Sequence, residues 1–117
     1  MQREETRTEL GLIRIHKNVI ASIASIGAIE IEGVKRVANN LASGIMEIIG
    51  KASPFSIKVD FNKNEEVKID IPIIVKYGFN IPEVANRVQD NIRMSLEKMT
   101  SLSVKDINVN VQGVERG

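Results

Sequence analysis

The sequence predicts an α+β fold, a small two-layer sandwich in which two long helices pack on one face of a mainly antiparallel sheet. Apolar and polar residues alternate over 57–77, which is typical of neighbouring strands. Apolar residues recur at helical spacing over 17–33 and again over 80–99. The chain has 117 residues, enough for one domain with a core of its own. The predicted order is strand, helix, an uncertain helix, two strands, helix and strand.

The first ten residues are charged and lack periodicity, so residues 1–10 are expected to form a flexible arm. Residues 11–117 are expected to follow as a single α+β domain. A short strand is predicted at 11–16, because Ile13 and Ile15 fall on the same face of an extended chain.

A helix is expected to begin near Lys17, where the apolar period changes to that of a helix face. The residues expected on its buried face are Val19, Ile20, Ile23, Ala24 and Gly27. Gly33 is expected to end this helix, because glycine adopts the left-handed conformation common at helix ends.

Residues 34–56 give the weakest pattern. The beginning of this stretch, 34–38, fits either a short strand or an irregular turn. Helical spacing then returns, with Gly50 as a stop, at Leu41, Ile45, Ile48 and Ile49. Pro54 lies in a break before the next strand.

Two adjacent antiparallel strands are predicted on either side of a turn at 62–66. The residues expected on their apolar face are Ile57, Val59, Phe61, Val67, Ile69, Ile71, Ile73, Val75 and Tyr77. Pro72 lies on the opposite face of the second strand and cannot donate a backbone hydrogen bond. This strand is therefore expected at a sheet edge, or bulged near Pro72.

The second long helix has a clear start, because Asn80 can cap it and Glu83 follows three residues later. Its expected buried stripe is Ile81, Val84, Ala85, Val88, Ile92, Leu96 and Met99. A last strand is predicted at 107–112, where apolar and amide side chains alternate.

Composition removes most kinds of chemistry. The chain has no cysteine and one histidine, which excludes thiol catalysis and thiolate or histidine-rich metal sites. No glycine-rich phosphate loop or serine-nucleophile motif occurs. His16 has no identifiable partner for acid–base work, so a structural role at the strand–helix junction is favoured. The sequence predicts a non-enzyme with no catalytic residue, no cofactor and no metal.

The same composition bears on partners and location. The net charge is +1 and aromatic residues make up 3%, which disfavours nucleic-acid binding. No apolar run approaches the length of about 20 residues that spans a bilayer, and the N-terminus lacks a secretory signal. A cytoplasmic protein without a membrane span of its own is therefore expected.

A protein-contact surface is the remaining candidate site. It consists of Ile45, Met46, Ile48 and Ile49, which occupy a wider arc of a short helix than one buried stripe needs. That these residues fill the core is an equal alternative. Self-association into a homo-oligomer is a further hypothesis, because the sheet faces are only partly accounted for.

Several segments, taken in order, also match a known family. They are 11–15, 19–24, 31–34, 67–71, 74–78, 81–85, 88–89, 99–100 and 111–114, together with Val104 and Val109. The most specific are the Tyr-Gly, Ile-Pro-Glu-Val and terminal Val-Gln-Gly-Val elements. In these features the chain resembles the alkaline shock protein family, also described as envelope stress response proteins. It departs from that family's pattern at His16 and at Asn39 and Asn40, where members often have other residues.

The resemblance implies a small bacterial protein without catalytic residues, tied to cell-envelope homeostasis. It implies a scaffold or regulator that acts by protein contacts, in some members held at the inner face of the membrane by a small membrane-embedded partner. Homo-oligomers are implied for some members. The alternative is a regulator of fatty-acid or phospholipid metabolism that binds an enzyme or an acyl ligand.

Overall fold

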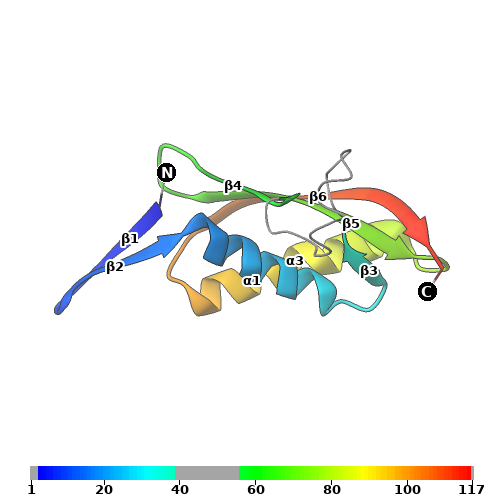
Figure 1. Cartoon of the computed structure of the whole chain (residues 1–117), viewed down its shortest axis with the longest axis horizontal. Helices are drawn as coiled ribbons and strands as arrows, with labels where there is room; N and C mark the ends of the chain where they lie inside the picture. The colour runs from blue at the N-terminus through cyan, green and yellow to red at the C-terminus, as the bar shows by residue number, and fades with distance from the viewer. Residues whose placement is uncertain (1–2, 39–55, 117) are drawn as a thin grey trace, which may run out of the picture.

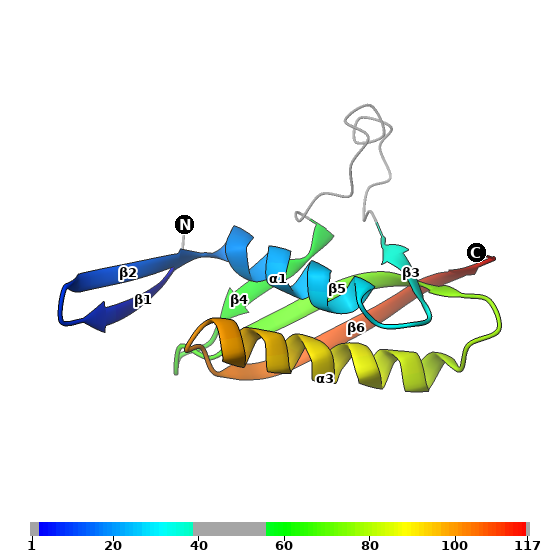
Figure 2. The same cartoon turned by 90° about the horizontal axis from the view of Figure 1, so that it is seen from below.

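A computed structural model describes residues 3–38 and 56–116 and confirms the α+β sandwich, with α1 and α3 on one face of the main sheet (Figures 1 and 2). The elements are β1 (Arg3–Thr8), β2 (Gly11–His16), α1 (Lys17–Ile29), β3 (Val34–Val37), β4 (Lys58–Phe61), β5 (Val67–Lys76), α3 (Ile81–Met99) and β6 (Val104–Glu115). Residues 34–38, which fitted a strand or a turn, thus contain a short strand.

The main sheet is built around β5. Among the described residues, β3 and β4 pair with one side of β5 in antiparallel orientation, and β6 pairs with the other side in parallel. The parallel pair is possible because α3 carries the chain back along the sheet between the two strands. The sheet is therefore mainly antiparallel with one long parallel pair.

The expectation that β5 lies at an edge is wrong, because β5 is the central strand. Pro72 is accommodated at the junction of two short neighbours. The pairing of β4 ends where Lys58 meets Asp70, and that of β3 ends where Val37 meets Ile73. The carbonyl oxygen of Pro72 accepts a hydrogen bond from Ala38 N at 2.9 Å. The Pro72 nitrogen, which carries no hydrogen, is on the same side of β5 and adjoins the gap between β4 and β3. A register irregularity between Ile73 and Ile74 lies next to the proline.

The core lies between the sheet and the helices. The side chains of β5 that face the helices have no exposed surface, and they are Val67, Ile69, Ile71, Ile73 and Val75. Ile20 of α1 and Ile92 and Leu96 of α3 pack against them in one cluster. Full burial of each such side chain contributes about 1.5–3 kcal/mol.

Helix α1 begins at Lys17 as predicted, but it differs from the sequence-based expectation at its end and in its buried face. It ends at Ile29, four residues before Gly33. Gly33 lies in the following turn with φ +103°, the left-handed region that glycine favours. Val19 is about half exposed, because the buried arc of α1 passes through Ile20, Ala21, Ile23, Ala24, Gly27 and Ala28 instead.

Helix α3 begins as predicted. Asn80 Oδ1 accepts from the backbone N–H of Glu83 at 3.0 Å, which satisfies one free donor of the first turn. The predicted stripe is buried at Val84, Val88, Ile92 and Leu96, and Ala85 is half-buried. Ile81 and Met99, the first and last residues of the helix, are exposed instead.

The first residues form a hairpin. β1 pairs with β2 in antiparallel register from Arg3 opposite His16 to Thr8 opposite Gly11. Residues 3–8, expected as part of an arm, therefore contain a strand. Their charged and polar side chains carry no apolar alternation, so the sequence gives no strand signal there.

Candidate functional site

The predicted interaction surface of Ile45, Met46, Ile48 and Ile49 lies outside the described residues. His16 is described, and it is the residue that precedes α1 at the end of β2, where its side chain makes no capping hydrogen bond. This is the strand–helix junction expected from the sequence.

The described part of the chain shows a different candidate surface on α1. It is formed by Val19, Ile26 and Ile29, which we call the α1 stripe. Their side chains are 47%, 55% and 54% exposed. The spacings of seven and three residues place them on one face of the helix, opposite the core. The α1 stripe is therefore a row of large apolar side chains in solvent.

The whole of α1 beyond its first residue is uncharged. No Asp, Glu, Lys or Arg occurs over residues 18–29. The exposed positions of α3 contrast with this, because they include charged residues. These are Arg87, Asp90, Glu97 and Lys98, with Ile81, Met94 and Met99 as apolar exceptions. A helix with apolar residues on its exposed face is typical of a partner surface, since burying it removes no charge from water.

The sequence pattern did not predict this surface. Val19 was expected on the buried face, and no position was predicted for Ile26 and Ile29. The apolar residues of α1 are chemically similar. The docking of α1 against α3 and the sheet decides which of them face solvent. The available signal was the absence of charge on both faces of the helix, which an ordinary amphipathic surface helix does not show.

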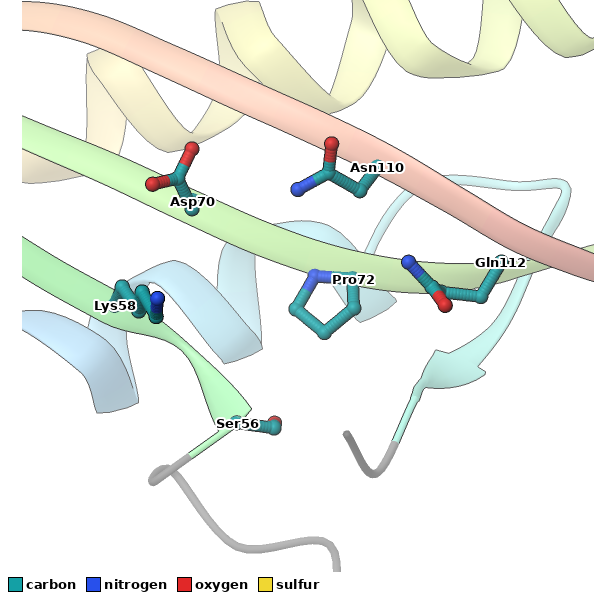
Figure 3. A pocket seen from close by; sticks show the side chains of 6 residues that line it. All are labelled: Ser56, Lys58, Asp70, Pro72, Asn110 and Gln112. Atoms are coloured by element: carbon teal, nitrogen blue, oxygen red, sulfur yellow. The ribbon is translucent and has the colours of Figure 1, made fainter. Parts of the chain in front are cut away.

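A polar hollow of about 200 Å³ lies on the sheet face opposite the helices (Figure 3). Its lining residues are Ser56, Lys58, Asp70, Pro72, Asn110 and Gln112. Asp70 Oδ1 accepts from Asn108 Nδ2 at 2.8 Å, and Lys58 is the cross-strand partner of Asp70. The bond between Asp70 and Asn108 joins neighbouring strands, as polar side chains on an exposed sheet face commonly do.

The carboxylates of β4 and β5 lie opposite lysine residues of the neighbouring strand. The register sets Asp60 opposite Lys68 and Asp70 opposite Lys58. Asp60 also lies 3.7 Å from Lys17 Nζ. Within the described residues, no group of three or more His, Asp or Glu side chains could hold a metal ion.

Comparison with known proteins decides the family. The sequence model of the alkaline shock protein 23 family, described as having a cell envelope-related function, matches residues 5–116. The chain belongs to this family. The match confirms the resemblance seen in the sequence and supports an envelope-related role for this alkaline shock family member. In the described residues, no helix is long and apolar enough to cross a membrane.

Relatives of this alkaline shock family member occur in bacteria. The Bacillus subtilis (strain 168) protein YqhY is 38% identical over 116 residues, which cover 98% of this chain and 85% of YqhY. YloU of the same strain is 37% identical over 113 residues, or 94% of this chain and 93% of YloU. Spy1614 of Streptococcus pyogenes serotype M6 is 27% identical over 110 residues, or 92% and 91% of the two chains. No solved structure matches the chain.

Proposed function

We propose that this protein is a non-enzymatic scaffold or regulator of the bacterial cell envelope that acts by binding other proteins. The observation that carries the proposal is the α1 stripe. Three large apolar side chains, each about half exposed, project from one face of a helix that carries no charge after Lys17. The cell envelope-related function of the family supports the cellular setting.

The energetics favour an apolar protein surface as the partner of the α1 stripe. Covering the exposed half of three such side chains contributes roughly 2–4 kcal/mol, at about 1.5–3 kcal/mol for each full side chain. Residues 18–29 carry no charge that would have to be desolvated. An apolar helix next to the membrane, presented by a small membrane-embedded protein, meets these requirements. Such a partner would hold this protein at the inner face of the membrane.

Self-association is part of the same proposal. A scaffold that joins several copies of its partner needs more than one contact surface on each chain. The α1 stripe lies on the helix layer, and the sheet forms the other layer of the described residues, so the two can serve different contacts (Figure 2).

Affinity purification of the tagged protein from its bacterial host, after mild cross-linking, tests the proposal. The variant is Ile26→Lys with Ile29→Lys, which places two charges on the α1 stripe. The matched control is Met99→Lys, because Met99 is as exposed as the stripe residues but lies at the end of α3. We expect the unmodified chain and the control to recover a small membrane protein, and the double variant to lose it.

Two outcomes would contradict the proposal. Equal recovery of the partner by all three chains would show that the α1 stripe is not the contact surface. Recovery of enzymes of fatty-acid or phospholipid synthesis, without a membrane partner, would replace the envelope scaffold with a metabolic regulator.

A further inference from the structure

The sheet has one long side that the described residues leave unpaired. β6 runs from Val104 to Glu115, and β5 is its only strand partner within residues 3–38 and 56–116. Figures 1 and 2 show β6 running the length of the sheet at its border. A strand in this position carries a row of backbone N–H and C=O groups that can pair with another strand.

Helix α3 covers only the first part of this edge. Arg93 NH1 donates to the carbonyl oxygen of Val104 at 2.8 Å. Gln89 Nε2 donates to the carbonyl oxygen of Ile107 at 3.0 Å. These two carbonyls therefore point away from β5 and are satisfied by side chains.

The next outward backbone groups belong to Val109 and Val111. Backbone direction alternates along a strand, so the groups of these two residues point the same way as the carbonyl of Ile107. Their side chains are half-buried and pack against the core from the helix side of the sheet. Asn108 precedes Val109, and Asn110 lies between the two valines. Both asparagines are exposed on the other face.

This part of β6 lacks two of the usual protections of an edge strand, charge and proline, and keeps a third, the bulge at Gln112. Residues 107–114 contain no charged residue and no proline. Soluble proteins commonly place lysine or proline on a free edge to prevent pairing with another chain. The uncharged edge therefore points to a strand partner.

We propose that β6 pairs with β6 of a second copy in antiparallel orientation, around a two-fold axis at Asn110. This inference rests on the self-association in the proposed function and names its surface. In this register Val109 hydrogen-bonds with Val111 of the partner subunit, and Val111 with the partner's Val109. These two pairs exchange four main-chain hydrogen bonds. The two copies of Asn110 form the non-hydrogen-bonded pair at the axis.

The pattern of β6 favours a second copy over an unrelated peptide. Around Asn110 the sequence is self-complementary, because valine meets valine on the helix side of the sheet. On the other face, Asn108 meets Gln112 of the partner subunit, so amide meets amide. No like charges meet in this central segment, because it contains none. Pairs of β-branched residues and of amides across antiparallel strands are stabilising.

A single cysteine tests the two-fold axis directly, because the chain has none of its own. Non-hydrogen-bonded residues in antiparallel strands have Cα atoms about 4.5 Å apart, which is within the range that a disulfide spans. We expect Asn110→Cys to form a disulfide-linked dimer under mild oxidation. Asn64→Cys is the matched control, because Asn64 is exposed in the loop before β5, and it should stay single-chain. Equal cross-linking of the two variants would overturn the proposal.

Charge substitution at the axis provides a second test, by sedimentation of the full chain. Asn110→Asp and Asn110→Lys each set like charges against each other, so each should weaken dimerisation by about tenfold or more. An equimolar mixture of the two should recover the dimer, since opposite charges then meet. Asn64→Lys should leave the dimer unchanged, and circular dichroism should show that all variants are folded.

The outcomes separate this inference from the proposed function. A dimer that survives Asn110→Asp and Asn110→Lys would place self-association elsewhere and overturn the β6 interface alone. If the unmodified chain remained monomeric at high concentration, self-association would be overturned altogether. Neither result affects recovery of a partner through the α1 stripe.

Discussion

Asn91 of α3 donates its side-chain amide to the backbone oxygen of Gly27 in α1, with Nδ2 and O 2.7 Å apart. The same nitrogen lies 3.1 Å from Glu30 Oε1. The two helices lie close together where Gly27 faces Ile92. A Cβ there would lie 3.4 Å from Ile92 Cγ1. This seam fixes the rotation of α1 and so directs Val19, Ile26 and Ile29 into solvent.

Asn91→Ala should lower the free energy of unfolding by about 1–2 kcal/mol, because the variant removes a partly buried hydrogen bond between the helices. Urea denaturation followed by circular dichroism measures this change. Asn86→Ala is the control, since Asn86 is exposed on the same helix. The control should be neutral or slightly stabilising, given the higher helix propensity of alanine. Equal effects of the two substitutions would show that the seam hydrogen bond contributes nothing.

Gly33→Ala should destabilise the protein by about 2–5 kcal/mol, through backbone strain together with overpacking. Gly33 has φ +103°, and a Cβ there would lie 2.7 Å from Val84 Cγ2 and 2.9 Å from Phe79 Cδ2. Gly78→Ala is a close control. Gly78 has φ +98° but no atom within 4 Å of an added Cβ, so its substitution adds strain without the contacts.

The midpoints of thermal and urea unfolding for these two glycine variants should therefore differ, with Gly33→Ala the less stable. If Gly78→Ala lost as much stability as Gly33→Ala, the backbone conformation alone would account for both, and the close packing around Gly33 would have no energetic weight.

Local signals predicted the elements that local physics determines. The start of α3 followed from Asn80 and Glu83, whose capping contact involves residues three apart. The alternating face of β5 followed from its own sequence. The central position of β5 could not be derived in the same way, because it depends on two short strands, β3 and β4, meeting beside Pro72. That arrangement joins parts of the chain far apart in sequence.

The candidate surface was the least predictable feature. Val19 and Ile20 are adjacent and chemically alike, yet Val19 is about half exposed and Ile20 is fully buried. Only the docking of α1 against α3 and the sheet distinguishes them. The edge of β6 was equally inaccessible, since the last strand's pattern gives its faces but not its neighbours.

The α1 stripe should be dispensable for stability. Ile26→Ala should change the free energy of unfolding by about 0.5 kcal/mol or less, because the side chain is more than half exposed. Ile23→Ala, three residues earlier and buried in the core cluster, should cost about 2–5 kcal/mol. Urea titrations of both variants measure the contrast. A large loss for Ile26→Ala would assign the α1 stripe to the fold and weaken its role as a partner surface.

Removing the side chain that covers the first half of the β6 edge should affect stability and association in opposite directions. Gln89→Ala leaves the carbonyl of Ile107 to solvent or to a partner strand, because Gln89 Nε2 donates to it in the folded chain. The loss of this hydrogen bond should cost about 0.5–1.5 kcal/mol of stability. The longer free edge should strengthen dimerisation through β6, since one more main-chain acceptor becomes available.

Sedimentation equilibrium of Gln89→Ala, compared with the unmodified chain, measures the second effect. Combining Gln89→Ala with Asn110→Lys distinguishes pairing of β6 edges from non-specific association of a destabilised chain. If the β6 edges pair, the lysine at position 110 should abolish the increase in association that Gln89→Ala produces. Association that persists in the double variant would show that the β6 edge is not where the copies meet.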